Sequence, residues 1–184
     1  MIVWLNGPFG AGKSTLAAGL NTALSGSVIA DPEDIGALLR QSMAGHHRQQ
    51  RDYQDYPAWR HLTVRLVAEL HQLTTGPVII PMTILNEQYA RKLHTPLSQL
   101  GTDFHHLVLH SDRAPLTTRT NRNVEYPGNE ERSEAVRAHR HRRALDYEHA
   151  ATARLHAGAH VIDTSALTPG QTLQAALAHL HTTT

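Results

Sequence analysis

Residues 2–14 read IVWLNGPFGAGKS. Residues 2–5 form a short apolar run of the kind that builds a strand buried on both faces. Gly7–Ser14 match the pattern G-x-x-x-x-G-K-[ST], and leucines at positions 16, 20 and 24 then recur on one helical face. A strand, this loop and a helix in that order are the context in which the motif binds nucleotide phosphates. The sequence therefore predicts a P-loop protein that binds a nucleoside triphosphate.

The motif predicts a role for each of its residues. The loop and the start of the helix should hold the phosphates, and the predicted nucleotide-binding residues are Gly7, Pro8, Phe9, Gly10, Ala11, Gly12, Lys13, Ser14 and Thr15. Lys13 should also act catalytically by reaching the β and γ phosphates, and the Ser14 hydroxyl should bind Mg²⁺. The alternative is a Gly-rich turn with an exposed lysine, but a chance match in this composition is on the order of one in a thousand. ATP and Mg²⁺ are thus the predicted cofactors.

Strand-like and helix-like segments alternate along the rest of the chain. Further strands are expected at 27–30, 78–83, 104–109 and 161–163, and helices at 14–24, 32–44, 57–73, 87–100, 113–121, 131–155 and around leucines 173, 177 and 180. This alternation predicts an α/β fold, a three-layer sandwich around a five-stranded parallel sheet. One strand before the P-loop and four after it are typical of small-molecule and nucleotide kinases. No repeat or linker divides the chain, so we expect one domain over residues 1–184.

Composition excludes several classes of protein. Seventeen basic and sixteen acidic side chains give a formal charge of +1, which is too balanced for a dedicated nucleic-acid binder. The chain has no cysteine, so disulfides, Cys-based zinc sites and thiol nucleophiles are excluded. No apolar stretch approaches the roughly 20 residues of a membrane span. A strand begins directly after Met1, so we expect no signal peptide and a cytoplasmic protein.

The fifteen histidines suggest a metal site only at first sight. No HExxH pattern occurs, and the neighbours His105 and His106 should point to opposite faces of a strand. We therefore expect the histidines to have structural roles.

The magnesium carboxylate of many P-loop proteins is missing. The third strand ends in Pro81-Met82-Thr83, so either Thr83 substitutes weakly or the carboxylate comes from the second strand. Asp31 follows that second strand, and ligands of parallel sheets bind at the carboxyl ends of strands. We predict Asp31 as the general base for an acceptor hydroxyl, with Asp34 as its competitor on the substrate side. A helix cap before Pro32 is the structural alternative for Asp31, and the two roles are compatible.

Arginines are concentrated in one segment. Nine of the fifteen lie between Arg113 and Arg154. A solvated helical face with ion pairs is one interpretation. The other is a helical lid, inserted at about 111–150, whose guanidinium groups neutralise charge during phosphoryl transfer. On that interpretation Arg119 and Arg122 are the predicted catalytic arginines, and further candidates are Arg137, Arg140 and Arg143.

Four stretches carry a resemblance to a known family. They are residues 2–7 leading into the P-loop, Asp31-Pro32-Glu33 with Gly36 and Leu39-Arg40, DYQDYPAWR at 52–60, and IIPMTI at 79–84. In these the chain resembles the bacterial tunicamycin resistance proteins, whose third strand shares Pro-Met-Thr. The resemblance implies a nucleoside-kinase-like, ATP-binding protein that confers resistance to tunicamycin, a uridine-containing antibiotic. It does so either by phosphorylating a hydroxyl of the drug or by sequestering the drug. A small-metabolite or nucleoside kinase is a third interpretation.

By the same resemblance, residues 52–60 shape the acceptor pocket. Gln54 is expected to bond a uracil edge, Tyr56 or Trp59 to stack on it, and Arg60 to pair with an anionic group. The alternative is a loop anchored by a core Trp59 and a helix that begins at Pro57.

Overall fold

A parallel sheet forms the centre of the computed structural model, which describes residues 1–122, 126–151 and 155–182. Its strands are β1 (Ile2–Asn6), β2 (Val28–Ile29), β3 (Val78–Pro81), β4 (Phe104–His110) and β5 (His160–Asp163). They lie in the order β2-β3-β1-β4-β5, and every neighbouring pair is parallel. The predicted α/β fold with a five-stranded parallel sheet is therefore confirmed.

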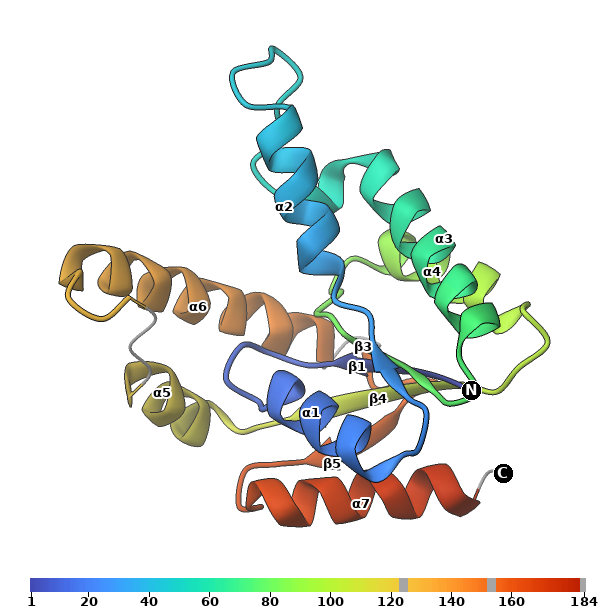
Figure 1. Cartoon of the computed structure of the whole chain (residues 1–184). Helices are drawn as coiled ribbons and strands as arrows, with labels where there is room; N and C mark the ends of the chain where they lie inside the picture. Colours follow the sequence, from blue (N-terminus) through green and yellow to red (C-terminus); the bar gives the residue numbers. More distant parts are fainter. Residues whose placement is uncertain (123–125, 152–154, 183–184) are drawn as a thin grey trace.

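Helices cover both faces of the sheet (Figure 1). Helices α1 (Lys13–Ala23) and α7 (Pro169–Thr182) cover one face, and α3 (Pro57–Leu73) and α4 (Glu87–Ser98) cover the other. Helix α2 (Pro32–Ser42) follows β2, and a single 3₁₀ turn, η1 (Tyr53–Asp55), precedes α3. None of the helices within the described residues is long and apolar enough to span a membrane.

Strand β1 is the centre of both hydrophobic cores. Its side chains alternate between the two faces of the sheet, as the strand geometry requires. Ile2 and Trp4 pack into the core under α3 and α4, while Val3 and Leu5 pack into the core under α1 and α7. All four are fully buried. This double burial explains why residues 2–5 are a continuous apolar run.

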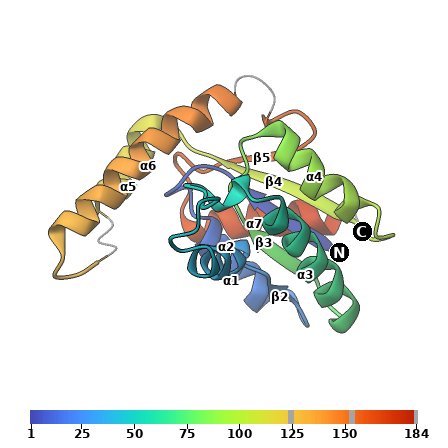
Figure 2. The ribbon, with the colours of Figure 1, turned by 90° about the horizontal axis from the view of Figure 1, so that it is seen from above.

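Helices α5 (Arg113–Arg122) and α6 (Glu130–Ala150) form an arm that projects beyond the sheet (Figure 2). The two helices lie side by side, and Asn129 caps the start of α6 by accepting a hydrogen bond from the Arg132 backbone. Residues 123–125, between the two helices, and residues 152–154, within the predicted helix over 131–155, lie outside the described residues. The arm begins at the carboxyl end of β4, which is the same edge of the sheet as the P-loop.

The observed elements differ from the predicted ones mainly at their ends. Strand β2 has two residues instead of four, because it lies at the sheet edge and pairs with β3 alone. Strand β4 runs one residue further, to His110, because β5 pairs with it there. His105 and His106 lie on opposite faces as expected, against His179 of α7 and His94 of α4.

Candidate functional site

A cavity of about 1150 Å³ opens at the carboxyl ends of the strands. The P-loop forms its floor, and the end of β3, the start of α2 and η1 form one side. Helices α5 and α6 and the loop after β5 close the other side. Ligands of open parallel sheets bind at this edge, so the cavity is the candidate site.

Glycines give the P-loop its shape. Gly7 and Gly12 have φ angles of 135° and 99°, in the region that side chains disfavour. A Cβ atom on Gly7 would lie 2.4 Å from the carbonyl oxygen of Leu109 in β4. Only glycine at position 7 lets the chain leave β1 and turn so close to the neighbouring strand.

The loop is tied to the end of β3 by buried hydrogen bonds. The Asn6 side chain accepts from the backbone N–H groups of Gly7, at 2.8 Å, and of Ile84, at 3.1 Å, and donates to the Ile84 carbonyl at 3.0 Å. The Thr83 hydroxyl donates to the Gly7 carbonyl at 2.7 Å. Both side chains are buried. Thr83, the residue at the position of the missing aspartate, therefore holds the P-loop against β3.

Lys13 curls back over the loop. Its Nζ donates to the carbonyls of Gly7 and Pro8, each at 3.0 Å. The pKa of Lys13 is lowered to about 8, chiefly by burial; the carboxylate of Glu33 opposes this shift, and the charge of Arg140 adds to it. Lys13 thus lies within the cavity with an acidic group facing it.

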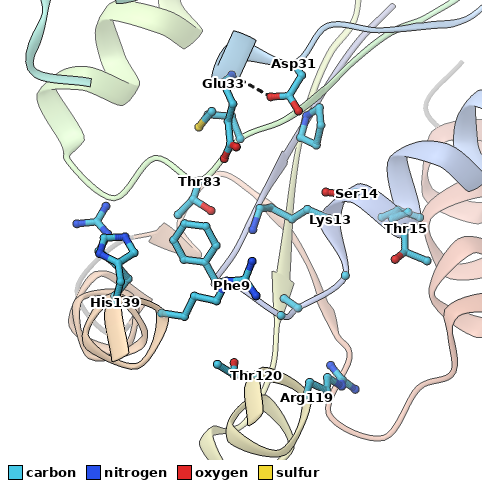
Figure 3. A pocket seen from close by; sticks show the side chains of 18 of the residues that line it. Phe9, Lys13, Ser14, Thr15, Asp31, Glu33, Thr83, Arg119, Thr120 and His139 are labelled. Carbon is cyan, nitrogen blue, oxygen red and sulfur yellow. Dashed lines mark hydrogen bonds between the residues drawn. The ribbon is translucent and has the colours of Figure 1, made fainter. Parts of the chain in front are cut away.

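Two carboxylates at the end of β2 enter the cavity side by side (Figure 3). Asp31 caps α2, because its Oδ1 accepts a hydrogen bond from the Glu33 backbone at 2.9 Å. Burial raises the pKa of Asp31, the bond from Glu33 opposes this, and the charge of Asp34 adds to it. The capping alternative is therefore observed, and Asp31 still lines the cavity. Asp34 is exposed and does not line it.

Glu33 is the carboxylate that sequence reasoning missed. It is the acidic group whose charge acts on Lys13, and Figure 3 shows its side chain directed toward the P-loop. A signal existed in the sequence: Glu33 stands two residues after Asp31 in the first turn of a helix that begins at the strand end.

The segment at 52–60 differs from the expectation. Gln54 lines the cavity, and its Nε2 donates to the Thr83 carbonyl at 2.9 Å. Tyr56, Trp59 and Arg60 do not line it. These three are buried and bonded elsewhere. The Tyr56 hydroxyl accepts from the Gln50 backbone at 2.8 Å, and Trp59 donates to the Pro32 carbonyl at 2.9 Å.

Arg60 belongs to the support of the segment. Its guanidinium donates to the Gln54 carbonyl and lies 4.2 Å from the ring centre of Tyr89, whose hydroxyl donates to Asp55. Because Trp59 is buried and bonded to the Pro32 carbonyl, it anchors the segment in the core, as the alternative to ligand stacking requires. The aromatic residue of this segment that lines the cavity is Tyr53.

The arginines of the arm divide into two groups. Arg119, Arg140 and Arg143 line the cavity, while Arg122 and Arg137 do not. Arg119 donates to the Thr164 carbonyl at 2.6 Å, which ties α5 to the loop after β5. Arg137 instead pairs with Glu130.

Helix α6 reaches the P-loop through Phe9. The rings of Phe9 and His139 are 6.0 Å apart, and the Arg140 guanidinium lies 5.9 Å from the Phe9 ring centre. Figure 3 shows Phe9 between Lys13 and His139. Sequence reasoning placed Phe9 in the loop but did not identify its contact with α6.

Further cavity residues had no role assigned from the sequence. They are Arg40, Arg51, Asp52, Tyr53, Thr120, His139 and Thr164. Arg40, Asp52 and Tyr53 belong to the stretches that carry the family resemblance, while the local sequence around the other four does not separate them from solvated polar residues. The described residues hold no group of three or more histidine or acidic side chains arranged for a metal ion.

Comparisons with known proteins agree with this geometry. A family model for an AAA domain matches residues 2–150. A solved tunicamycin resistance protein from Deinococcus radiodurans is 27% identical with a TM-score of 0.73, over 97% of this chain and 94% of that one. No curated protein sequence matches the chain.

Two kinases share the fold at lower identity. A sugar kinase from Janibacter sp. HTCC2649 is 18% identical with a TM-score of 0.63, over 98% of this chain and 94% of that one. A gluconokinase from Sinorhizobium meliloti 1021 is 17% identical with a TM-score of 0.62, over 97% and 90%. The resemblance to the tunicamycin resistance proteins is thus confirmed, and the chain belongs to the AAA domain family with a P-loop kinase-like fold.

Proposed function

We propose that the protein is a cytoplasmic, ATP-dependent phosphotransferase that acts on a hydroxyl group of tunicamycin. One observation carries the proposal: a single cavity holds both a P-loop lysine and two carboxylates that follow β2, the edge strand two places from β1 in the sheet. The first group suits the phosphates of a nucleotide, and the second suits a hydroxyl that must lose its proton. The similarity to the Deinococcus protein supports the choice of acceptor.

The nucleotide is expected to lie along the P-loop. Its phosphates replace the Gly7 and Pro8 carbonyls as partners of Lys13 Nζ, which those carbonyls now hold at 3.0 Å. Backbone N–H groups at the start of α1 face the same space. Arg140 and Arg143 approach from α6 and Arg119 from α5, so α5 and α6 act as a lid over the phosphates.

The residues present suit a magnesium ion. Mg²⁺ prefers oxygen ligands and keeps several of its waters, and the cavity offers the Ser14 hydroxyl together with the carboxylate of Glu33. The Thr83 hydroxyl donates its proton to the Gly7 carbonyl, and its oxygen lone pairs remain available for a hydrogen bond or a metal ion. When bound, the ion neutralises charge on the phosphates.

In the transfer step, ATP loses its γ-phosphoryl group to the acceptor. The acceptor oxygen forms a bond to the γ-phosphorus, the bond from that phosphorus to the β–γ bridging oxygen breaks, and ADP leaves. The acceptor proton passes to a carboxylate, which we assign to Asp31, because burial raises its pKa and so makes it a stronger base. Glu33 faces Lys13 and is assigned to the metal side of the cavity.

The second candidate function is nucleotide-dependent sequestration of the drug without chemistry. It is favoured by the bond between Asp31 Oδ1 and the Glu33 backbone, which occupies one oxygen of the proposed base. A kinase of another small hydroxylated metabolite is the third candidate, since the fold also occurs in a sugar kinase.

The test is incubation of the purified protein with ATP, Mg²⁺ and tunicamycin, followed by mass spectrometry. We expect a product heavier by one phosphoryl group. Asp31→Asn should slow its formation by about 10²-fold or more while nucleotide and drug still bind. Asp34→Asn is the matched control, because Asp34 lies outside the cavity. Tight drug binding without any product would establish sequestration instead. If the drug is neither bound nor phosphorylated, both functions are excluded.

A further inference from the structure

Tyr53 is a cavity residue that the proposed mechanism does not use. It opens η1, and its ring packs against Gly36 of α2. A Cβ atom on Gly36 would lie 2.6 Å from the Tyr53 ring, so a side chain at position 36 would displace it. The Arg40 guanidinium, one turn further along α2, lies 4.8 Å from the ring centre.

The other support of the ring is the core of the molecule. The Trp59 ring centre is 5.3 Å from that of Tyr53, and Trp59 is itself fully buried and bonded to the Pro32 carbonyl. Tyr53 is therefore held between α2 and α3 in one orientation. A side chain fixed in this way can impose geometry on a ligand at little cost in conformational entropy.

The Tyr53 hydroxyl lies among acidic groups. Burial and the charges of Glu33, Asp52 and Asp31 raise the pKa of Tyr53 well above its usual value. The hydroxyl therefore stays protonated and can donate a hydrogen bond. It makes no hydrogen bond to any residue in the part of the chain that the structure describes.

The charges at this end of the cavity indicate the class of ligand. Three carboxylates, of Asp31, Glu33 and Asp52, line it together with the guanidinium groups of Arg40 and Arg51. Arg40 already covers the Tyr53 ring. Carboxylates accept hydrogen bonds from hydroxyl groups and repel anions. With three carboxylates against two guanidinium groups, the lining is net acidic and suits a neutral ligand that carries several hydroxyl groups better than a sugar acid.

We propose that Tyr53 determines acceptor specificity: its hydroxyl donates a hydrogen bond to an oxygen of a neutral, sugar-like acceptor, whose own hydroxyls bond the surrounding carboxylates. The inference rests on the proposed function for where the acceptor lies. It adds the chemical class of the acceptor and the residue that recognises the acceptor. Tyr53 acts in binding, and it is not a proton carrier.

The test measures ligand binding by calorimetry in the presence of a non-hydrolysable ATP analogue and Mg²⁺. Tyr53→Phe removes only the hydroxyl, and we expect about five- to tenfold weaker tunicamycin binding with unchanged affinity for the ATP analogue. Tyr89→Phe is the matched control, because Tyr89 loses a hydroxyl bonded to Asp55 outside the cavity. Gly36→Ala, which displaces the ring, should weaken drug binding as well, provided that the melting temperature shows it folded.

Binding measurements with N-acetylglucosamine, a neutral sugar, and gluconate, a sugar acid, distinguish failure of this inference from failure of the proposed function. If the drug binds and Tyr53→Phe matches the wild type, the role of Tyr53 is refuted while the proposed function stands. If the nucleotide binds and the drug does not, the proposed function fails. The inference then survives only if the neutral sugar binds more tightly than the sugar acid and Tyr53→Phe weakens that binding. Tighter binding of gluconate, or no binding of either compound, refutes it.

Discussion

The P-loop and the α5–α6 arm face each other across the cavity and are built in opposite ways. The P-loop continues from a fully buried strand and is fixed by the buried side chains of Asn6 and Thr83. In α6, which has 21 residues, only Ser133 and Tyr147 are buried. The loop is therefore positioned by the core, whereas α6 buries little of its surface.

Polar contacts hold the base of the arm. The Tyr147 hydroxyl is 3.0 Å from His110 Nδ1 and 3.3 Å from His156 Nε2, and Arg119 donates to Thr164. Local stability falls where few apolar contacts hold an element. The difference teaches that one wall of the cavity is set into the core, while the arginines of the opposite wall stand on a helix with little buried surface.

The sharpest way to test the cradle is to remove its lysine. Lys13→Ala should weaken Mg·ATP binding at least a hundredfold, because charge-assisted phosphate contacts contribute about 1.5–3 kcal/mol each. Lys92→Ala is the control, because Lys92 is the other lysine of the chain and is exposed. Calorimetry measures the affinities, and equal values for both variants would refute the P-loop assignment.

Asn6→Ala tests whether the core really holds the loop. The change leaves the buried backbone groups of Gly7 and Ile84 without their partner, so we expect a loss of about 2 kcal/mol in the free energy of unfolding. Urea denaturation measures it. Asn21→Ala, on the exposed side of α1, should change the value by less than about 0.5 kcal/mol. A stable Asn6→Ala variant would show that the loop does not need this anchor.

The pKa of Lys13 predicts how nucleotide binding depends on pH. In the empty site the pKa is about 8, and phosphate binds the protonated lysine. Above pH 8 the free protein must take up a proton to bind, so affinity should fall by up to about tenfold per pH unit. Below pH 8 this effect disappears. Lys13→Arg, which stays charged, should show no such fall in the same calorimetric series, and parallel curves for the two proteins would contradict the assignment.

The smallest expected effect tests the base of the arm. Tyr147→Phe removes the hydroxyl between His110 and His156 and should lower the free energy of unfolding by about 1 kcal/mol. Hydrogen exchange should rise in α6 and stay unchanged in α1. Tyr126→Phe, on the segment before α6, serves as the control, since its ring contact with Arg132 is retained. Equal exchange in both variants would mean that other contacts hold the arm.

The same contrast separates what was predictable from what was not. The P-loop motif and the apolar runs that predict strands are local patterns. Residues 2–14 and the alternation of strands and helices therefore predicted the fold. The short length of β2 was not predictable, because it depends on which strand lies at the sheet edge. Gln54 and Asp31 line the cavity, while Tyr56, Trp59 and Arg60 are buried away from it.

The sequence by itself determined the phosphate-binding loop, the parallel sheet and the charged character of the arm, since each follows from residues close together in the chain. Only the tertiary structure decided which side chains of a polar stretch enter the cavity. Tyr53 and Trp59 are both aromatic and six residues apart, yet Gly36 leaves room for one at the cavity while the core takes the other. That choice depends on packing between α2 and α3, which no local pattern records.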